Sequence, residues 1–236
     1  MTCADDATVE AVVRKFLRDN SLTLAFGAAF LLALAGQAFV GRAEFNEQLV
    51  TDGLAPVSLG TYVTSSDFAV DVTENWQSEY LQFFLYIFGT VWLLQRGSPE
   101  SKVMHKAGLE TDEEQRVGKY ARSDSPRWAR SRGWRRLLFS HSLGLVMAAL
   151  FVLSWLAQSI AGVAAYDEQR LRQLRAPIGW GEYLVSAEFW SRTLQNWQSE
   201  FLAVASMVIL SVYLRQRGSP ESKPVGSSHH TTGVEG

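Results

Sequence analysis

Residues 22–41 read LTLAFGAAFLLALAGQAFVG and residues 143–163 read LGLVMAALFVLSWLAQSIAGV, and neither stretch carries a charged side chain. About twenty apolar residues are enough for an α-helix to cross roughly 30 Å of hydrocarbon. The alternative is a buried core helix of a soluble protein, but uncharged runs of this length are rare there. The mean composition, 47% hydrophobic with a net charge of −2, hides this segregation of apolar residues into blocks. The sequence therefore predicts an all-α membrane protein.

The chain also contains an internal repeat. NWQSE occurs at 75–79 and 196–200, and QRGSPESK occurs at 95–102 and 216–223, so both motifs recur after 121 residues (from 75 to 196 and from 95 to 216). A repeat at a fixed offset indicates a repeated structural unit. The same offset, without a gap, pairs further identical residues: Ser21 with Ser142, Gln37 with Gln158, Gly41 with Gly162, Pro56 with Pro177, Tyr62 with Tyr183, and Phe68 with Phe189.

This repeat decides how two shorter apolar stretches, 80–94 and 201–214, are interpreted. Extended back through Trp76 and Trp197, each becomes the second span of a helical hairpin. We therefore predict four transmembrane helices in two hairpins. The expected order is a cytoplasmic N-terminus with an interfacial helix (1–21), a first hairpin repeat (22–102, spans about 22–41 and 76–95), a basic cytoplasmic linker (103–136), a second hairpin repeat (137–223, spans about 143–163 and 197–215) and a disordered cytoplasmic tail (224–236).

The distribution of basic residues predicts the topology. Segment 95–136 is rich in Arg and Lys, whereas loop 42–74 holds only Arg42. Cytoplasmic loops of membrane proteins carry an excess of Lys and Arg, so both termini and the linker are expected in the cytoplasm. The second outer loop weakens this pattern because it contains Arg170, Arg172, Arg175 and Arg192. Both hairpins have the same orientation, which defines a parallel repeat.

Several segments are expected at the membrane surface. Val9, Val12, Val13 and Phe16 recur at helical spacing among basic residues, which predicts an interfacial amphipathic helix. Trp and Arg favour the headgroup zone, and basic residues there attract anionic lipid. Lipid explains the basic linker more simply than nucleic acid does. The expected interface anchors are Trp76, Trp197, Trp128, Trp134, Arg135 and Arg136.

The second helix of each hairpin is expected to begin at Ser66 or Ser186 and to run without a break to Gln95 or Gln216, where Gly97 would stop the first. QRGSPESK then has two interpretations, a capped helix exit at the cytoplasmic surface or a docking site for a cytoplasmic partner. The motif residues concerned are Arg96, Gly97, Pro99, Glu100, Arg217, Gly218, Pro220 and Glu221.

A polar cluster is predicted at the outer third of the bilayer. Helix arithmetic places Gln37 at the height of Glu79, so we expect Gln37 to hydrogen-bond Glu79 or Asn75, and Gln158 to hydrogen-bond Glu200 or Asn196. Ionisable residues at that depth indicate ion or proton handling. The alternative is a structural role, in which these residues hold the hairpins together at the interface. The cluster comprises Gln37, Asn75, Gln77, Ser78, Glu79, Gln158, Asn196, Gln198, Ser199 and Glu200.

The sequence shows no pattern for catalysis. It contains no glycine-rich phosphate loop, no nucleophile elbow and no metal-ligand spacing, and Cys3 is the single cysteine. We therefore expect a protein without enzymatic activity, cofactor or metal.

The order FLRDNSL, apolar span, EFNEQL, P-x-S-L-G-x-Y, NWQSE(Y/F)L and QRGSPESK resembles a family of bacterial membrane proteins known only as a domain of unknown function. The resemblance covers nearly the whole chain outside 1–14, 103–125 and 224–236. It implies the location and the fold, and it carries no mechanism.

Three functions remain open. The first is a structural or accessory membrane protein that associates with itself or with a larger membrane complex. The second is a proton- or cation-conducting protein that uses the paired intramembrane glutamates. The third is an envelope-stress factor that acts on lipid through its basic cytoplasmic surface.

Overall fold

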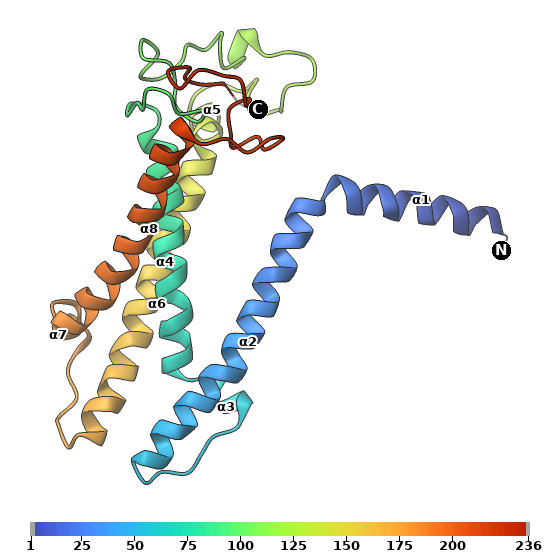
Figure 1. Ribbon diagram of the computed structural model, residues 1–236. Helices are drawn as coiled ribbons and strands as arrows, with labels where there is room; N and C mark the ends of the chain where they lie inside the picture. The colour runs from blue at the N-terminus through green and yellow to red at the C-terminus, as the bar shows by residue number, and fades with distance from the viewer. Residues whose placement is uncertain (1–2, 235–236) are drawn as a thin grey trace. The chain divides into compact units, whose positions relative to one another are not determined.

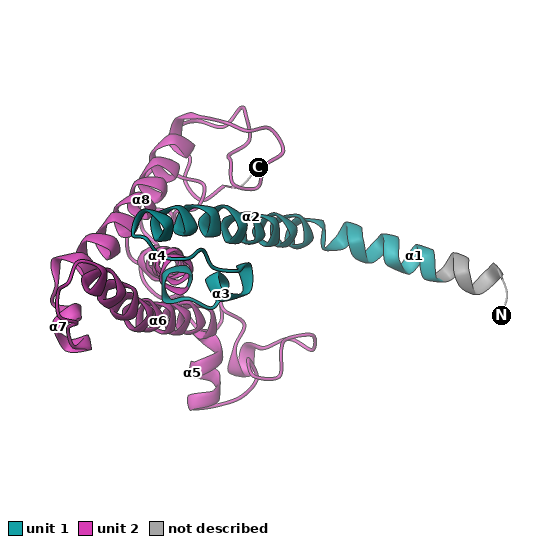
Figure 2. Cartoon of the chain, turned by 90° about the horizontal axis from the view of Figure 1, so that it is seen from below, with its two compact units in different colours: residues 1–68 teal, residues 69–236 magenta. Residues whose placement is uncertain are grey.

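The computed structural model describes residues 3–234, in which all regular structure is helical and no strand occurs (Figure 1). By contacts the chain divides into two compact units, Met1–Phe68 and Ala69–Gly236 (Figure 2). The division falls inside the first predicted hairpin, in the first turn of a long helix. Each unit is described by itself.

The first unit consists of α1 (Cys3–Asp19), α2 (Ser21–Thr51) and α3 (Leu59–Val63). From Val9 onward the side chains of α1 are exposed. The helix ends where Asn20 leaves helical geometry and donates its side-chain amide to the Phe16 carbonyl at 2.8 Å. After this break, α2 departs from the axis of α1 (Figure 1).

The second unit contains most of α4 (Ser66–Gly89), the 3-10 turn η1 (Gly118–Tyr120), α5 (Trp134–Ser140), α6 (Ser142–Arg172), α7 (Trp180–Leu184) and α8 (Ala187–Tyr213). In both views α4, α6 and α8 lie side by side, and α6 runs opposite to the other two (Figures 1 and 2). The central linker and the C-terminal tail gather at the end of this bundle where α4 and α8 finish (Figure 1).

Two of the described helices, α2 and α6, are long and apolar enough to span a membrane. Only 6% of the apolar window of α2 and 17% of that of α6 are buried. Core helices of soluble proteins bury most of such a stretch, so these two helices present apolar surface that needs an apolar environment.

The ends of α4 and α8 differ from the sequence prediction. The expected helix to Gln95 was too long, since α4 ends at Gly89. The Thr90 hydroxyl bonds the Tyr86 carbonyl at 2.8 Å, and Val91 N bonds Phe88 O, which tightens the chain into a turn. Threonine hydroxyls that bond the carbonyl four residues back slightly destabilise and bend helices. In the second copy α8 ends at Tyr213, near the expected position.

The loop after α2 is fastened to that helix by an aromatic cluster. Tyr62 is buried, and its ring centroid lies 5.5 Å from that of Phe45 and 5.4 Å from that of Phe68. A Cβ at Gly41 would overlap the Tyr62 hydroxyl, so only glycine permits this close approach. The Asn46 side chain accepts a hydrogen bond from the Val57 amide at 2.7 Å.

The loop after α6 repeats this arrangement at the equivalent positions. Tyr183 is buried against Gly162, and its ring lies 5.8 Å from Tyr166 and 5.5 Å from Phe189. Asp167 accepts a hydrogen bond from the Ile178 amide at 2.8 Å, as Asn46 does from Val57. The glycine and tyrosine that are identical in the two copies therefore fix each loop to the helix that precedes it.

Candidate functional site: a buried polar layer between α4, α6 and α8

An ion-pair cluster joins α8 to α4. Arg192 on α8 donates from Nε to Glu74 Oε2 at 2.7 Å and from a terminal nitrogen to Asp71 Oδ1 at 2.8 Å. Glu188 adds a third acidic group 4.0 Å from the same guanidinium.

One to two turns further along α4 the contacts continue. Trp197 Nε1 on α8 donates to Gln77 Oε1 at 2.8 Å, and Gln77 is completely buried. The next residue, Ser78, is also buried and lies within hydrogen-bonding reach of the Glu200 carboxylate. Glu79 is close enough to Glu200 for the two charges to repel each other. The NWQSE segments of the two copies therefore meet between α4 and α8.

Helix α6 adds aromatic rings and further buried polar groups. The Trp155 ring lies 5.9 Å from Phe189 and 6.0 Å from Trp197, so it covers the segment of α8 between them. Gln158, one turn along α6, is completely buried, and the buried Ser159 accepts a hydrogen bond from Trp180 Nε1 at 3.1 Å. All three helices thus present polar side chains to the bundle interior.

Five buried polar atoms in this region have no hydrogen-bond partner among the described residues. They are Gln77 Nε2, Trp155 Nε1, both side-chain amide atoms of Gln158, and Thr193 Oγ1. A buried donor or acceptor left without a partner costs about 1–3 kcal/mol. Buried polar atoms in folded proteins are therefore nearly always satisfied, and a group of five at one level of a bundle is unusual.

The structure brings some of the predicted cluster together and leaves other members apart. Gln77, Ser78, Glu79 and Glu200 converge, as described above. Asn75 and Asn196 instead turn back on their own helices, to the carbonyls of Asp71 at 2.8 Å and Arg192 at 3.0 Å. Gln198 and Ser199 are exposed. Gln37 belongs to the first unit, so its hydrogen bond to Glu79 or Asn75 stays a prediction.

The expected hydrogen bond from Gln158 to Glu200 or Asn196 is wrong. The stacking of Trp155 between Phe189 and Trp197 places Trp155 opposite the middle of that segment of α8. Because α6 and α8 are antiparallel, Gln158 then lies near Phe189, several residues from Asn196 at about 1.5 Å each. The error came from counting depth along each helix alone, without the aromatic packing that sets their relative height.

Sequence reasoning did not identify Asp71, Glu74, Arg192, Thr193 or Trp155 as members of this layer. One signal was present in the repeat, where the shift of 121 residues pairs Asp71 with Arg192 (71 + 121 = 192). Opposite charges at equivalent positions are complementary if the two positions face each other, which they do here at 2.8 Å.

Of the expected interface anchors, Trp76, Trp128 and Trp134 are exposed, and the exposed Arg135 lies 5.5 Å from the Trp134 ring. Two anchors behave differently. The indole N–H of Trp197 donates a hydrogen bond to Gln77 on α4. Arg136 forms an ion pair with Asp112 at 3.1 Å.

The two QRGSPESK motifs fold into the same tight loop. Ser101 Oγ accepts the Gln95 amide at 2.9 Å, and Ser222 Oγ accepts the Gln216 amide at 2.9 Å. Gly97 and Gly218 both have positive φ, of 88° and 81°, which favours glycine. The expectation that Gly97 stops α4 is therefore corrected, because the glycine forms a turn eight residues beyond the helix end.

The C-terminal segment, expected to be disordered, packs against the first of these loops. The Lys223 ammonium group is buried and donates to four carbonyls, those of Gly97, Ser228, His229 and Thr231. The Gly97 amide in turn donates to Thr232 Oγ1 at 2.9 Å. Burial lowers the pKa of Lys223, and the nearby Arg215 lowers it further. The tail carbonyls that accept hydrogen bonds from this one buried ammonium group hold the polar tail in place.

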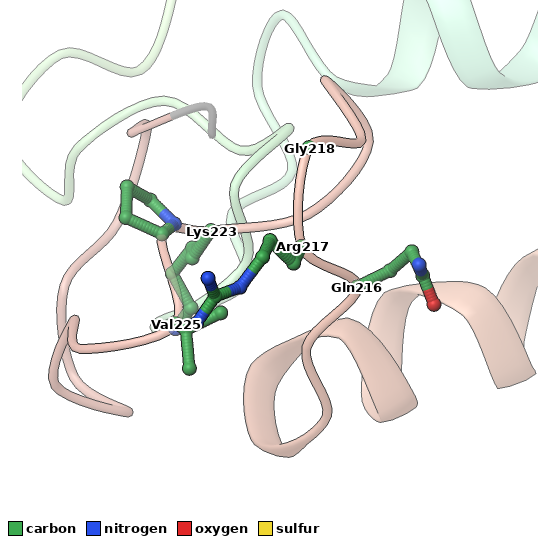
Figure 3. Close-up of a pocket in the computed structure, with 6 residues that line it drawn as sticks. Gln216, Arg217, Gly218, Lys223 and Val225 are labelled. Atoms are coloured by element: carbon green, nitrogen blue, oxygen red, sulfur yellow. The ribbon is translucent and has the colours of Figure 1, made fainter.

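The second loop remains accessible. Arg217, Gly218, Pro220 and Glu221 are exposed, whereas Gly97 and Pro99 of the first loop are buried and Glu100 accepts a hydrogen bond from Tyr86. An open hollow of about 310 Å³ lies beside this second loop, and Figure 3 shows the residues that line it. Its lining is Gln216, Arg217, Gly218, Lys223, Pro224 and Val225. Among the described residues no group of three or more His, Cys, Asp or Glu is placed to hold a metal ion.

The chain was also compared with known proteins. No curated protein and no solved structure matches it significantly. A family model described as "Domain of unknown function (DUF6766)" matches residues 13–234. The match includes both copies of the repeat, the polar layer and the segment that packs on the first QRGSPESK loop. The chain therefore belongs to the DUF6766 family.

Proposed function

We propose that this chain is a non-enzymatic multi-pass membrane protein, a structural or accessory subunit that associates with itself or with a larger membrane complex. The observation that carries the proposal is the exposure of apolar side chains along α2 and α6, whose apolar windows are only 6% and 17% buried. Surface of this extent must contact lipid or another subunit. The polar residues face inward and join the helices.

The proposal includes α4 and α8 as the second and fourth spans. With 24 and 27 residues they measure about 36 and 40 Å at the usual rise, enough to cross a bilayer. Their cytoplasmic halves expose Phe83 and Phe88 on α4 and Ile209 and Leu210 on α8. A polar inner face and an apolar outer face are what a helix in a membrane bundle needs.

The proposed location is the inner membrane of a bacterium, with both termini and the linker in the cytoplasm. The linker supports this orientation because its exposed Trp128 and Trp134 accompany many arginines, a combination typical of the cytoplasmic headgroup region. Anionic lipid is the proposed partner of this surface.

Cysteine accessibility tests the topology. Cys3 is the only cysteine, so a Cys3→Ser chain is a clean background for single cysteines at Ala55, Ala176, Ser123 and Ser227. A membrane-impermeant maleimide added to intact spheroplasts should label positions 55 and 176 alone. Labelling of 123 and 227 should require permeabilisation. Labelling of all four in intact cells would overturn the four-span arrangement.

Purification in a mild detergent tests the accessory role. A stoichiometric partner or a defined homo-oligomer by native mass spectrometry is the expected result, and in-cell crosslinking from the exposed face of α6, at Leu153 or Ile160, should reproduce it. A matched crosslinker at the buried Ser154 should give no product. A lone monomer with bound lipid and no crosslink would contradict this function.

A second candidate, proton or cation conduction, is favoured by the proximity of Glu79 and Glu200. Segment 201–214 of α8 has no charged residue, which limits any path toward the cytoplasm. Proteoliposomes with a pH-sensitive dye and an imposed potential test conduction directly. Flux that disappears in a Glu79→Gln, Glu200→Gln double variant with an unchanged oligomeric state would establish the second candidate over the first.

A further inference from the structure

The five unpartnered polar atoms belong to one region of the second unit. Thr193 lies one turn from Phe189 and one turn from Trp197 on the same face of α8, and the Trp155 ring stacks on Phe189 and packs at a tilt against Trp197. Gln158 follows Trp155 by one turn on α6. Gln77 is bonded through its oxygen to Trp197. The unpartnered atoms therefore lie within or beside one group of aromatic rings.

Four of the five unpartnered atoms belong to side chains without exposed surface. Gln77, Gln158 and Thr193 each have 0% exposed surface. Lipid or bulk solvent therefore does not satisfy their polar atoms in the folded protein. Buried polar atoms that lack a partner within the protein are satisfied by small molecules held inside the fold.

The chemistry of the atoms selects the occupant. Gln77 Nε2, Gln158 Nε2 and Trp155 Nε1 are N–H donors, and only Gln158 Oε1 and Thr193 Oγ1 accept. This excess of donors excludes a cation. An anion is disfavoured because Arg192 is already surrounded by Asp71, Glu74 and Glu188, which leaves the neighbouring charge negative. Water, which both donates and accepts, fits both conditions.

We infer that α4, α6 and α8 enclose a site for internal water molecules, bound by Gln77, Trp155, Gln158 and Thr193. A buried water makes about three hydrogen bonds, so five unpartnered atoms call for about two waters. The inference concerns the packing of these three helices and does not depend on whether the chain is an accessory subunit or conducts ions.

Substitution of the threonine distinguishes a hydrated site from a dry one by the sign of its effect. Thr193→Val keeps the side-chain shape and removes the hydroxyl. In a dry site this removes an unsatisfied group and leaves the melting temperature in detergent unchanged or higher. In a hydrated site a water loses a partner and the melting temperature falls, which is the expected result. An unchanged or higher value overturns the inference.

Thr73→Val is the matched control. Thr73 lies on α4 and its hydroxyl already bonds the Ala69 carbonyl of its own helix at 2.6 Å. Its removal leaves no buried water without a partner. The melting temperature should therefore fall much less in Thr73→Val than in Thr193→Val. An equal fall in the two variants would show that replacing either threonine by valine destabilises the protein to the same extent, with or without a bound water. That result would also overturn the inference.

Radiolytic labelling reads the water directly in the unmodified protein. Hydroxyl radicals formed from bound water oxidise the side chains next to it. Phe189 is only 2% exposed and its ring packs on Trp155, so it should be oxidised to an extent comparable to Phe139, which is 37% exposed. Oxidation of Phe139 without oxidation of Phe189 would overturn the inference, and this result does not require any variant to fold.

Discussion

At the scale of single residues, the glycines beneath the two buried tyrosines have the clearest steric role. Gly162→Ala would place a methyl group over the Tyr183 hydroxyl and near its ring. Overpacking of this kind costs about 1–3 kcal/mol. Gly144→Ala on the same helix meets nothing within 4 Å and gains helix propensity, so it should stabilise slightly. In detergent, the melting temperature should decrease in the order G144A, wild type, G162A. An unchanged melting temperature for G162A would contradict the contact.

More of the aromatic clusters around Tyr62 and Tyr183 than of the polar layer could be predicted from the sequence alone. Identity between the two copies marked Gly41, Tyr62 and Phe68 and their counterparts, because a close approach tolerates few residue types. Thr193 and Trp155 were not marked. Their role depends on the relative height of α6 and α8, which tertiary packing sets and no local pattern records.

At the scale of the elements, two lysines at equivalent motif positions hold different loops. Lys223 binds the tail, while Lys102 bonds the Gly108 carbonyl at 2.7 Å and pairs with Glu110 at 2.6 Å. Lys223→Met would leave four carbonyls without their donor. Amide hydrogen exchange should then increase in residues 224–234 with little change in 103–112.

The reciprocal variant, Lys102→Met, provides the matched control. Exchange should increase in residues 103–112 and stay constant in the tail. Equal changes in both loops for either lysine would show general unfolding of this end of the bundle instead of two separate anchors.

The helix boundaries agree with those predicted from the sequence where capping residues define them, and they differ elsewhere. The start of α8 was predicted from Ser186, whose hydroxyl accepts the Phe189 amide at 3.2 Å. The end of α4 was not, because an apolar run to Leu94 gives no sign that Thr90 bends the chain back. Order in the tail was missed for a related reason, since its polar composition is typical of disorder and its stabilising lysine precedes it.

At the scale of the whole molecule, the charge pair between equivalent positions predicts the outcome of an exchange. Asp71→Arg places two guanidinium groups together and should destabilise strongly, since breaking a partly buried pair leaves uncompensated charge. Asp71→Arg with Arg192→Asp restores opposite charges in reversed order and should recover much of the lost stability. Detergent melting temperatures provide the measurement, at about 2–4 °C per kcal/mol for a chain of this size.

Reversal of the exposed Glu10 and Arg14 pair on α1 is the control for this exchange. Both side chains are largely in solvent, so the single and double reversals should change the melting temperature little. If the double exchange at 71 and 192 were no better than Asp71→Arg alone, the two positions would not face each other in the folded protein.

The pairing of Asp71 with Arg192 also bears on how the two halves associate. Two first halves assembled with each other would oppose aspartate to aspartate at this contact, and two second halves would oppose arginine to arginine. Each half now carries the complement that the other lacks. Copies of a single half would therefore bring like charges together at this contact, which favours pairing of a first half with a second half over pairing of either half with itself.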